Sequence, residues 1–456
     1  MTGAIRAVAL RAWAGGPLAP YAEIFAIPLA WRFCVAGIIG RMPISMYGLG
    51  TVLLISAGTG HYGLAGSVAA AGSLGGAVCA PQVGGLVDRI GQRRVLIPLC
   101  LTFALAMAGL AAAVELRAPE WTLFACGIVG GAAVPPTGPM ARARWSVLLA
   151  GSKRLHAAFS VESVADELCF VIGPAAVALL ATQLHPTAGI GCAALCALAG
   201  SLWFAAQRST EPPVPAPGRA SAMRAAGAPR ERRLAAPGLA VLLPVCLFIG
   251  AMFVSIDLST VDFATRLGHK PLAGLLLACY AFGSATGGLW YGTRTWQAPA
   301  SRRMAVTLSL TVAGVCSFWA MPSLLVLAPV IYLCGLTIAP TLIAGYSLLE
   351  ATARPGRATE AMSWLSTGIA VGVAVGSTAV GFILDAFGPR WGYAFAAASG
   401  LSAAAVYLSG LRRASAWEAA AASAGAGDAG AVDTGTVDTG TVDTGAVDTG
   451  AGGRAG

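Results

Sequence analysis

The chain alternates long apolar runs with short polar breaks. Twelve of these runs approach or exceed the ~20 residues with which an α-helix crosses a bilayer. They lie near 33–56, 62–83, 95–114, 120–140, 159–182, 187–207, 238–261, 271–292, 304–320, 323–346, 361–384 and 391–411. The pattern therefore predicts an all-α membrane protein with twelve transmembrane helices.

The composition supports a lipid environment. Of the 456 residues, 57% are hydrophobic and 11% are charged, whereas about a quarter of the residues in soluble globular proteins are charged. The eleven cysteines all lie in apolar runs, and no CxxC pair occurs. We therefore expect them to be buried as small hydrophobic residues, with no disulfide and no metal site.

The placement of the basic residues predicts the orientation. A net charge of +9 would suggest a nucleic-acid partner in a soluble protein, but in a membrane protein the distribution of Lys and Arg matters more. If the N-terminus is cytoplasmic, the inside segments hold 24 of the 29 Lys and Arg residues. These segments include "RIGQRR" (89–94), "RAR" (142–144), "KR" (153–154), "SRR" (301–303) and "LRR" (411–413). We expect both termini to be cytoplasmic and no nucleic acid to bind.

The breaks between the runs divide the chain into five parts. The longest break is rich in Pro, Ala and Arg and follows the sixth run, so it reads as a flexible cytoplasmic linker. The last part repeats AVDTG and TVDTG and has too little apolar surface to fold. The predicted parts are a cytoplasmic segment (1–24), a six-helix bundle (25–207), the linker (208–236), a second six-helix bundle (237–413) and a disordered tail (414–456).

The two six-helix halves share short sequence matches at corresponding positions. "GGL" at 84–86 recurs at 287–289, and "RLHAAFSVES" (154–163) aligns with "RATEAMSWLS" (357–366) at the same offset of 203. Matches at one constant offset indicate an ancient duplication. Two pseudo-symmetric halves, related by an axis along the membrane normal, are typical of transporters that work by alternating access.

One cytoplasmic loop carries a recognisable motif. "GGLVDRIGQRRVLI" (84–97) resembles the signature G-x-L-A-D-R-x-G-R-K-x-x-L of the major facilitator superfamily, with mild departures at Val87 and Gln92. The residues that match include Gly84, Leu86, Asp88, Arg89, Gly91 and Arg93. The resemblance implies that the glycines let the second span pack against the eleventh. It also implies that Asp88, with Arg89 and Arg93, latches the cytoplasmic side shut. A simpler alternative is that the arginines only anchor the loop to anionic lipid.

Arg41 interrupts the first apolar run, 33–56, which carries no other charge. A charge in hydrocarbon costs at least about 2.5–3.5 kcal/mol and generally faces a partner or a wet cavity. The fifth run holds three acids, Glu162, Asp166 and Glu167. Because Asp166 lies about as deep in its run as Arg41 does in the first, we expect Arg41 to pair with Asp166 or Glu167 across the two spans.

The three acids define the candidate site. Glu162 and Asp166 are four residues apart and share a helix face, whereas Glu167 points about 100° away. One arginine cannot neutralise three carboxylates, so at least one acid has no counter-charge. Burial and the nearby like charges both favour the protonated form of such an acid. Arg41, Glu162, Asp166 and Glu167 are therefore the predicted proton-coupling residues. A static clamp and direct contact with substrate remain as alternatives.

Two further acids lie near the outer end of the seventh run. Asp257 and Asp262 follow most of its apolar residues. We expect them to be solvated loop acids, with contacts to an outer gate or to a substrate cation as the alternative.

Gly173 and Pro174 lie in the middle of the fifth run. They resemble the start of the G-P-x-x-G-G signature of the antiporter branch, although the closing pair here is Val177-Ala178. Proline in a helix interior removes a hydrogen bond and bends the helix, so we expect a helix bend here. Plain helix packing explains the pair nearly as well.

The function class follows from these features. The chain has no GxSxG, HExxH or GxxxxGK[ST] motif, so we expect neither an enzyme nor an ATP-driven permease, and no cofactor. Arginine outnumbers lysine 27 to 2, which indicates the codon bias of a high-GC bacterium. The resemblance implies a monomeric multi-pass transporter of the bacterial plasma membrane. We expect proton-coupled export of a small amphipathic drug or metabolite, with import of a sugar or other metabolite as the alternative.

Overall fold

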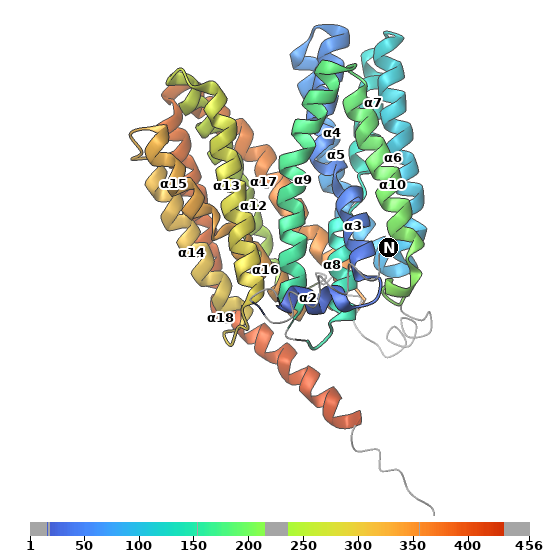
Figure 1. The fold of residues 1–456 in the computed structure, drawn as a ribbon, viewed down its shortest axis with the longest axis vertical. Helices are drawn as coiled ribbons and strands as arrows, with labels where there is room; N and C mark the ends of the chain where they lie inside the picture. The colour runs from blue at the N-terminus through green and yellow to red at the C-terminus, as the bar shows by residue number, and fades with distance from the viewer. Residues whose placement is uncertain (1–15, 17–18, 153, 215–235, 355, 433–456) are drawn as a thin grey trace, which may run out of the picture.

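The computed structural model describes residues 16, 19–152, 154–214, 236–354 and 356–432. Within these ranges the chain forms helices joined by short turns, and no strand (Figure 1). The helices are α2 (Ala19–Ala26), α3 (Ala30–Arg41), α4 (Pro43–Thr59), α5 (Tyr62–Ile90), α6 (Gln92–Glu115), α7 (Glu120–Ala132), α8 (Thr137–Leu148), α9 (Leu155–Gln183), α10 (Ala188–Ala206), the 3-10 turn η1 (Arg208–Thr210), α12 (Leu239–Arg266), α13 (Lys270–Thr293), α14 (Ala300–Phe318), α15 (Leu324–Gly335), α16 (Ile338–Thr352), α17 (Ala358–Phe387) and α18 (Pro389–Val432).

The membrane-spanning pattern agrees with the sequence. Eleven spans in the described ranges are long and apolar enough to cross a membrane, judged by length and composition. The remaining predicted helix, α14, corresponds to the ninth run (304–320) and has a lower hydropathy because Arg302 and Arg303 lie in its first turn. It packs against α16 and α18 within the second bundle.

Three spans consist of two shorter helices placed end to end, α3 with α4, α7 with α8, and α15 with α16. Proline has no backbone N–H and disfavours a helical residue before it. Pro43 is accordingly the first residue of α4, and Pro135 and Pro136 separate α7 from α8. These breaks place Arg41 and the start of α8 in the interior of the first bundle.

The two halves form separate bundles that lie side by side, α3 to α10 and α12 to α18 (Figure 1). They meet where α5 packs against α17 and where α9 packs against α13 and α16. The sequence offset of 203 carries α9 onto α17 almost end to end. The contact of α5 with α17 is therefore related by pseudo-symmetry to the contact of α13 with α9.

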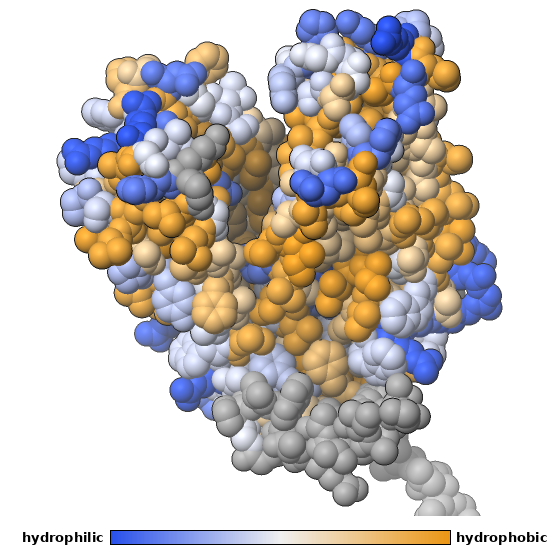
Figure 2. Space-filling view, turned by 45° about the horizontal axis from the view of Figure 1, so that its top comes forward, coloured by the Kyte–Doolittle hydropathy of each residue, from blue (hydrophilic) through white to orange (hydrophobic). Residues whose placement is uncertain are grey.

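The bundles touch at one end of the molecule and diverge at the other. Figure 2 shows a hollow between them, bordered largely by hydrophobic residues. We call the end that holds α2 and the starts of α9 and α17 the closed end, and the opposite end the open end. The hollow is called the cleft.

Helix α2 lies across the closed end beneath both bundles (Figure 1). The Tyr21 hydroxyl donates a 2.7 Å hydrogen bond to the Leu289 carbonyl of α13. Glu23 forms a 2.6 Å ion pair with Arg154, directly before α9. The predicted N-terminal segment (1–24) therefore includes the start of a helix that contacts both halves, and residues 1–15 lie outside the described ranges.

The sequence placed Arg142 and Arg144 in a cytoplasmic loop, and this prediction was wrong. The fourth span continues through α8 to Leu148, and the two arginines are 1% and 0% exposed. The predicted fourth run ends at residue 140, before these charges, whereas the helix continues beyond them to Leu148.

The predicted linker and tail also differ from the structure at their edges. Thr210, within the predicted linker, is buried, while residues 215–235 lie outside the described ranges. The tail was predicted to be disordered from residue 414, yet α18 continues to Val432. Glu418 accepts hydrogen bonds from the backbone amides of Ala300 (2.6 Å) and Ser301 (3.0 Å) and so caps α14. The AVDTG repeats lie mostly beyond the described residues.

Candidate functional site

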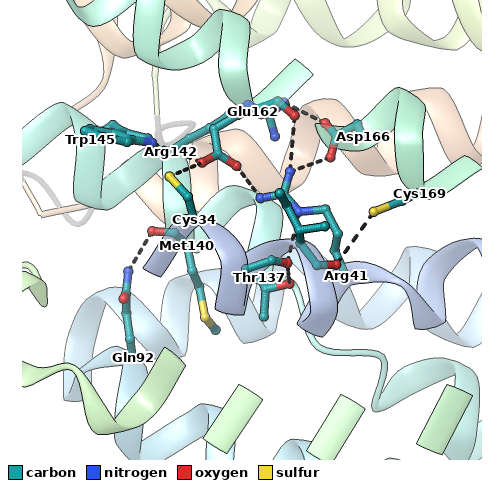
Figure 3. Close-up of polar contacts among 12 residues, drawn as sticks. Cys34, Arg41, Gln92, Thr137, Met140, Arg142, Trp145, Glu162, Asp166 and Cys169 are labelled. Carbon is teal, nitrogen blue, oxygen red and sulfur yellow. Dashed lines mark hydrogen bonds and ion pairs between the residues drawn. The ribbon is translucent and has the colours of Figure 1, made fainter. Parts of the chain in front are cut away.

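Arg41 ends α3 in the interior of the first bundle and is 3% exposed (Figure 3). Its guanidinium forms ion pairs with Glu162 and, at 2.7 Å, with Asp166. Its Nε atom also donates to the Gly37 carbonyl in the last turn of its own helix. The partners are thus Asp166, one of the two that the sequence proposed, and Glu162 in place of Glu167.

A second arginine completes this cluster. Arg142 Nη2 forms a 2.6 Å ion pair with Asp166, and Trp145 Nε1 donates a 3.0 Å hydrogen bond to Glu162 (Figure 3). The Arg142 guanidinium also stacks 4.1 Å from the ring centre of Tyr346, on α16 of the other half. Two cations and two anions leave the cluster without net charge. We call Arg41, Arg142, Glu162 and Asp166 the charge clamp.

Glu167 lies outside the charge clamp. Its Oε1 atom accepts a 2.6 Å hydrogen bond from the Ser284 hydroxyl on α13, so it links the two halves. Among the described residues it has no ion-pair partner, and its side chain is partly exposed. The surplus acid that the sequence predicted is therefore Glu167, because Arg142 neutralises the other candidate.

Asp257 is a further acid within a span. It was expected in a solvated loop, but it lies inside α12 with Asp262. Its side chain is exposed, and no ion pair forms at it within the described residues. Asp262 instead forms a 2.8 Å ion pair with Arg266 on the same helix.

Asp88 connects the halves at the closed end. Its carboxylate accepts hydrogen bonds from the backbone amides of Thr359 (3.2 Å) and Glu360 (2.9 Å), at the start of α17. The first amides of a helix lack intrahelical partners and carry positive partial charge, so they favour a carboxylate. Glu360 is held in turn by an ion pair with Arg357.

The glycines of the motif allow α5 to approach α17. A Cβ atom on Gly84 would lie 2.8 Å from Ser363 Oγ and 2.9 Å from Glu360 Cα. Gly85 is similarly close to the Glu360 carboxyl. Leu86 is 45% exposed and lies in a groove at the edge of this contact, not in its buried centre.

The second part of the motif holds the turn between α5 and α6. Gly91 has a φ of +97°, a backbone conformation that favours glycine. The Arg93 amide donates a 3.0 Å hydrogen bond to Glu211, so the first residues after the first bundle cap α6. Arg89 lines a groove with Glu360 on the outside of the α5–α17 contact.

Gln92, a departure from the motif, has a defined role. Its side chain donates to the Met140 carbonyl (3.0 Å) and accepts from Arg144 Nε (2.7 Å). Arg144 also donates to Thr210 and to the Phe204 carbonyl. This network joins the start of α6, the end of α10 and the end of η1 to α8.

The pseudo-symmetric contact between α9 and α13 has its own hydrogen bond. At the closed end, His156 Nε2 donates a 2.6 Å hydrogen bond to the Arg294 carbonyl after α13. A Cβ atom on Gly292 would lie 2.6 Å from Ser160 Oγ of α9. The α13–α9 contact is thus as close as the α5–α17 contact, without an acid in the turn.

A sequence model of the Major Facilitator Superfamily matches residues 33–293 and 240–437. The chain belongs to the major facilitator superfamily. Members of this superfamily are membrane transporters of small molecules, so the chain is a transporter and not an enzyme. No curated protein sequence matches the chain.

Solved structures of the superfamily share this fold. A bacterial homologue of the iron transporter ferroportin, outward-facing with soaked iron, has a TM-score of 0.65 at 13% identity, covering 84% of this chain and 99% of its own. The human organic anion transporter MFSD10 (TETRAN) has a TM-score of 0.60 at 18% identity, with coverages of 83% and 100%. FucP in the outward conformation has a TM-score of 0.60 at 14% identity, with coverages of 84% and 98%.

The remaining predicted residues, Gly173 and Pro174, lie within an uninterrupted α9. The buried Gly173 faces Ser45 of α4, where a side chain would collide, and Ser45 donates to the Cys169 carbonyl at 2.8 Å. The observed role of Gly173 in this superfamily member is close packing, and a bend at Pro174 remains a proposal.

Sequence reasoning missed Arg142, Trp145 and Ser284. Arg142 could have been found, because the apolar run resumes after Arg144 with "WSVLLA" (145–150). Ser284 has no signal of its own, since a single serine in an apolar run is not informative and only the packing of α13 on α9 pairs it with Glu167.

Proposed function

We propose that this superfamily member is a proton-coupled secondary transporter that exports a small amphipathic molecule by alternating access. The observation that carries the proposal is the hydrogen bond from Ser284 to Glu167. This acid is partly exposed, has no arginine partner among the described residues, and joins two helices that must separate or slide when the halves rock.

Protonation of Glu167 would act on that contact. A hydroxyl bound to an ionised carboxylate forms a charge-assisted bond, about twice as strong as a neutral one. A proton on Glu167 therefore weakens the link between α9 and α13 and favours movement of the halves. The neutral charge clamp has the complementary role of a fixed support for α9, and Gly173 with Pro174 provides the bend.

The orientation follows from the distribution of charge. We assign the closed end to the cytoplasm, because the turn between α5 and α6, with Arg89, Arg93 and Arg94, lies there beside the start of α17. Asp88 is then the cytoplasmic latch, and the cleft faces outward, as in the outward-state relatives. We propose a monomer in a bacterial plasma membrane, with N- and C-termini in the cytoplasm.

The test is substrate-driven proton movement. The protein is reconstituted in liposomes that hold a pH-sensitive dye, and a panel of amphipathic compounds is screened for proton flux under an imposed gradient. Glu167→Gln should lose the flux that a hit compound causes while still binding it. Asp262→Asn, which lies on the surface of α12, should transport as wild type.

Full flux in Glu167→Gln would contradict its assignment as proton carrier. The direction of flux separates the alternatives, because protons that move opposite to the compound indicate an antiporter. Protons that accompany the compound would indicate an importer, and the export proposal would then be wrong.

A further inference from the structure

Helix α2 is held firmly against the first half. Only three residues (27–29) connect it to α3, and the Ile27 amide in this turn donates a 3.3 Å hydrogen bond back to the Ile24 carbonyl. The ion pair of Glu23 with Arg154 joins α2 to the start of α9, which belongs to the same half. Because of this short connection and this ion pair, α2 has to move with the first half.

The Tyr21 side chain reaches the second half where α13 passes close to α9. Its hydroxyl donates to the Leu289 carbonyl of α13, and a Cβ atom on Gly292 of the same helix would collide with it. That Cβ atom would also lie 2.6 Å from Ser160 Oγ of α9. The hydroxyl therefore lies between two helices that belong to different halves. A separation of α9 from α13 at the closed end would pull it away from its acceptor.

The inner face of α2 is buried at the closed end. Tyr21 and Ile24 belong to one apolar cluster, which also includes Phe33 of the first half and Tyr291 of the second. An isolated helix of eight residues is not stable in water. The contacts with the two bundles therefore stabilise α2, and α2 in turn adds buried contacts to the closed end.

We propose that α2 is a strap that keeps the closed end shut, with the Tyr21 hydroxyl as its attachment to the second half. This inference rests on the alternating access of the proposed function, and it adds a control on opening that involves neither a proton nor the substrate. Asp88 holds the α5–α17 contact, whereas the pseudo-symmetric α9–α13 contact has no acid in its turn. Tyr21 supplies a bond between the halves at that second contact.

The test is the rate at which the closed end admits a water-soluble reagent. Ser363 of α17 is 1% exposed and lies against Gly84 of α5, away from α2. In Ser363→Cys protein in lipid nanodiscs, a charged methanethiosulfonate reagent reaches the thiol at position 363 only when α5 and α17 part. Peptide mass spectrometry follows labelling at position 363 and at the native Cys34. Cys34 is buried inside the first half, so its labelling reports loosening of that bundle.

Three variants are compared in the Ser363→Cys protein. Tyr21→Phe keeps the ring and removes the hydroxyl, and it should speed labelling at position 363 about twofold to tenfold, which is the effect of one hydrogen bond on an equilibrium. A chain that begins at residue 27 should label faster still. Glu23→Gln is the matched control, because its exposed ion pair stays within the first half, and it should change the rate less than about twofold. Labelling of Cys34 should not change in Tyr21→Phe or Glu23→Gln.

An unchanged rate at position 363 in Tyr21→Phe would overturn the inference, whether or not the shortened chain labels faster. Equal acceleration at position 363 and at Cys34 would also overturn it, because α2 would then only support the first bundle. The shortened chain could fail to fold, which its size-exclusion profile would reveal, but Tyr21→Phe decides the question by itself.

The outcome is separable from that of the proposed function, because the labelling needs neither a proton gradient nor a transported compound. Faster labelling in Tyr21→Phe, without coupled proton flux in liposomes, would leave the strap in place and contradict proton-coupled export. Coupled flux with unchanged labelling in Tyr21→Phe would do the reverse.

Discussion

The contacts within the charge clamp predict that removing one buried charge leaves its ion-pair partner without a counter-charge. In Arg41→Met the unbranched methionine fills much of the space of the arginine stem but leaves Glu162 without its cation. Glu162 is 1% exposed and would keep only neutral contacts, mainly the Trp145 indole. Asp166 would still be neutralised by Arg142.

The expected magnitude follows from this asymmetry. Breaking a buried ion pair by removing one partner costs about 3–5 kcal/mol, because the remaining charge stays buried. Glu162→Gln should cost less, about 1–3 kcal/mol, since Arg41 retains Asp166 and the glutamine oxygen can still accept from Trp145. The double variant has no uncompensated charge on Glu162, so it should also cost about 1–3 kcal/mol instead of the sum.

The assay is a double-mutant cycle on the free energy of unfolding. Wild-type protein, both single variants and the double variant are unfolded by SDS titration in mixed micelles, with helix content as the readout. Arg41→Met with a loss below about 1 kcal/mol would contradict the reasoning. Additive losses in the double variant would contradict it as well, because they would mean that Arg41 and Glu162 stabilise the fold independently.

Three further predictions concern the closed end and the tail. Asp88→Asn removes a charge from the α17 start, so exchange of the amides at 359–360 should accelerate, consistent with a loss of about 0.5–2 kcal/mol, as read by hydrogen-exchange mass spectrometry. Gly84→Val places side-chain atoms against the α17 backbone, so the same amides should lose protection and transport should fail, while Leu86→Val on the exposed face should transport normally. Glu418→Ala should destabilise the protein by about 1 kcal/mol in thermal unfolding, and a chain that ends at residue 413 should lose at least as much, whereas one that ends at 432 should match wild type.

The sequence predicted the parts of the fold that depend on local patterns. Hydropathy located the spans, since the energetic rule for crossing a membrane acts on each segment separately. The motif at 84–97 predicted that the second span approaches the eleventh, and the structure has Asp88 on the α17 amides. These features need no knowledge of how the helices rotate about their axes.

The candidate site depends on how each helix is rotated about its own axis, and the sequence does not determine this rotation. Helical geometry separates Asp166 from Glu167 by about 100°, but only packing decides which of the two faces α3. The structure turns Glu162 and Asp166 toward Arg41 and leaves Glu167 for Ser284. Arg142 was missed because a charge was taken to end a span, whereas the interior of a bundle accepts a charge that has a partner.

The contact between Asp88 and the start of α17 at the closed end uses a side chain on one side and main-chain amides on the other. Asp88 binds main-chain amides, which every residue except proline provides. A substitution of Glu360 by any residue except proline therefore leaves its amide in place, while position 88 must keep an acceptor. A search for covarying residue pairs would miss the bond between positions 88 and 360, because the Glu360 side chain takes no part in it.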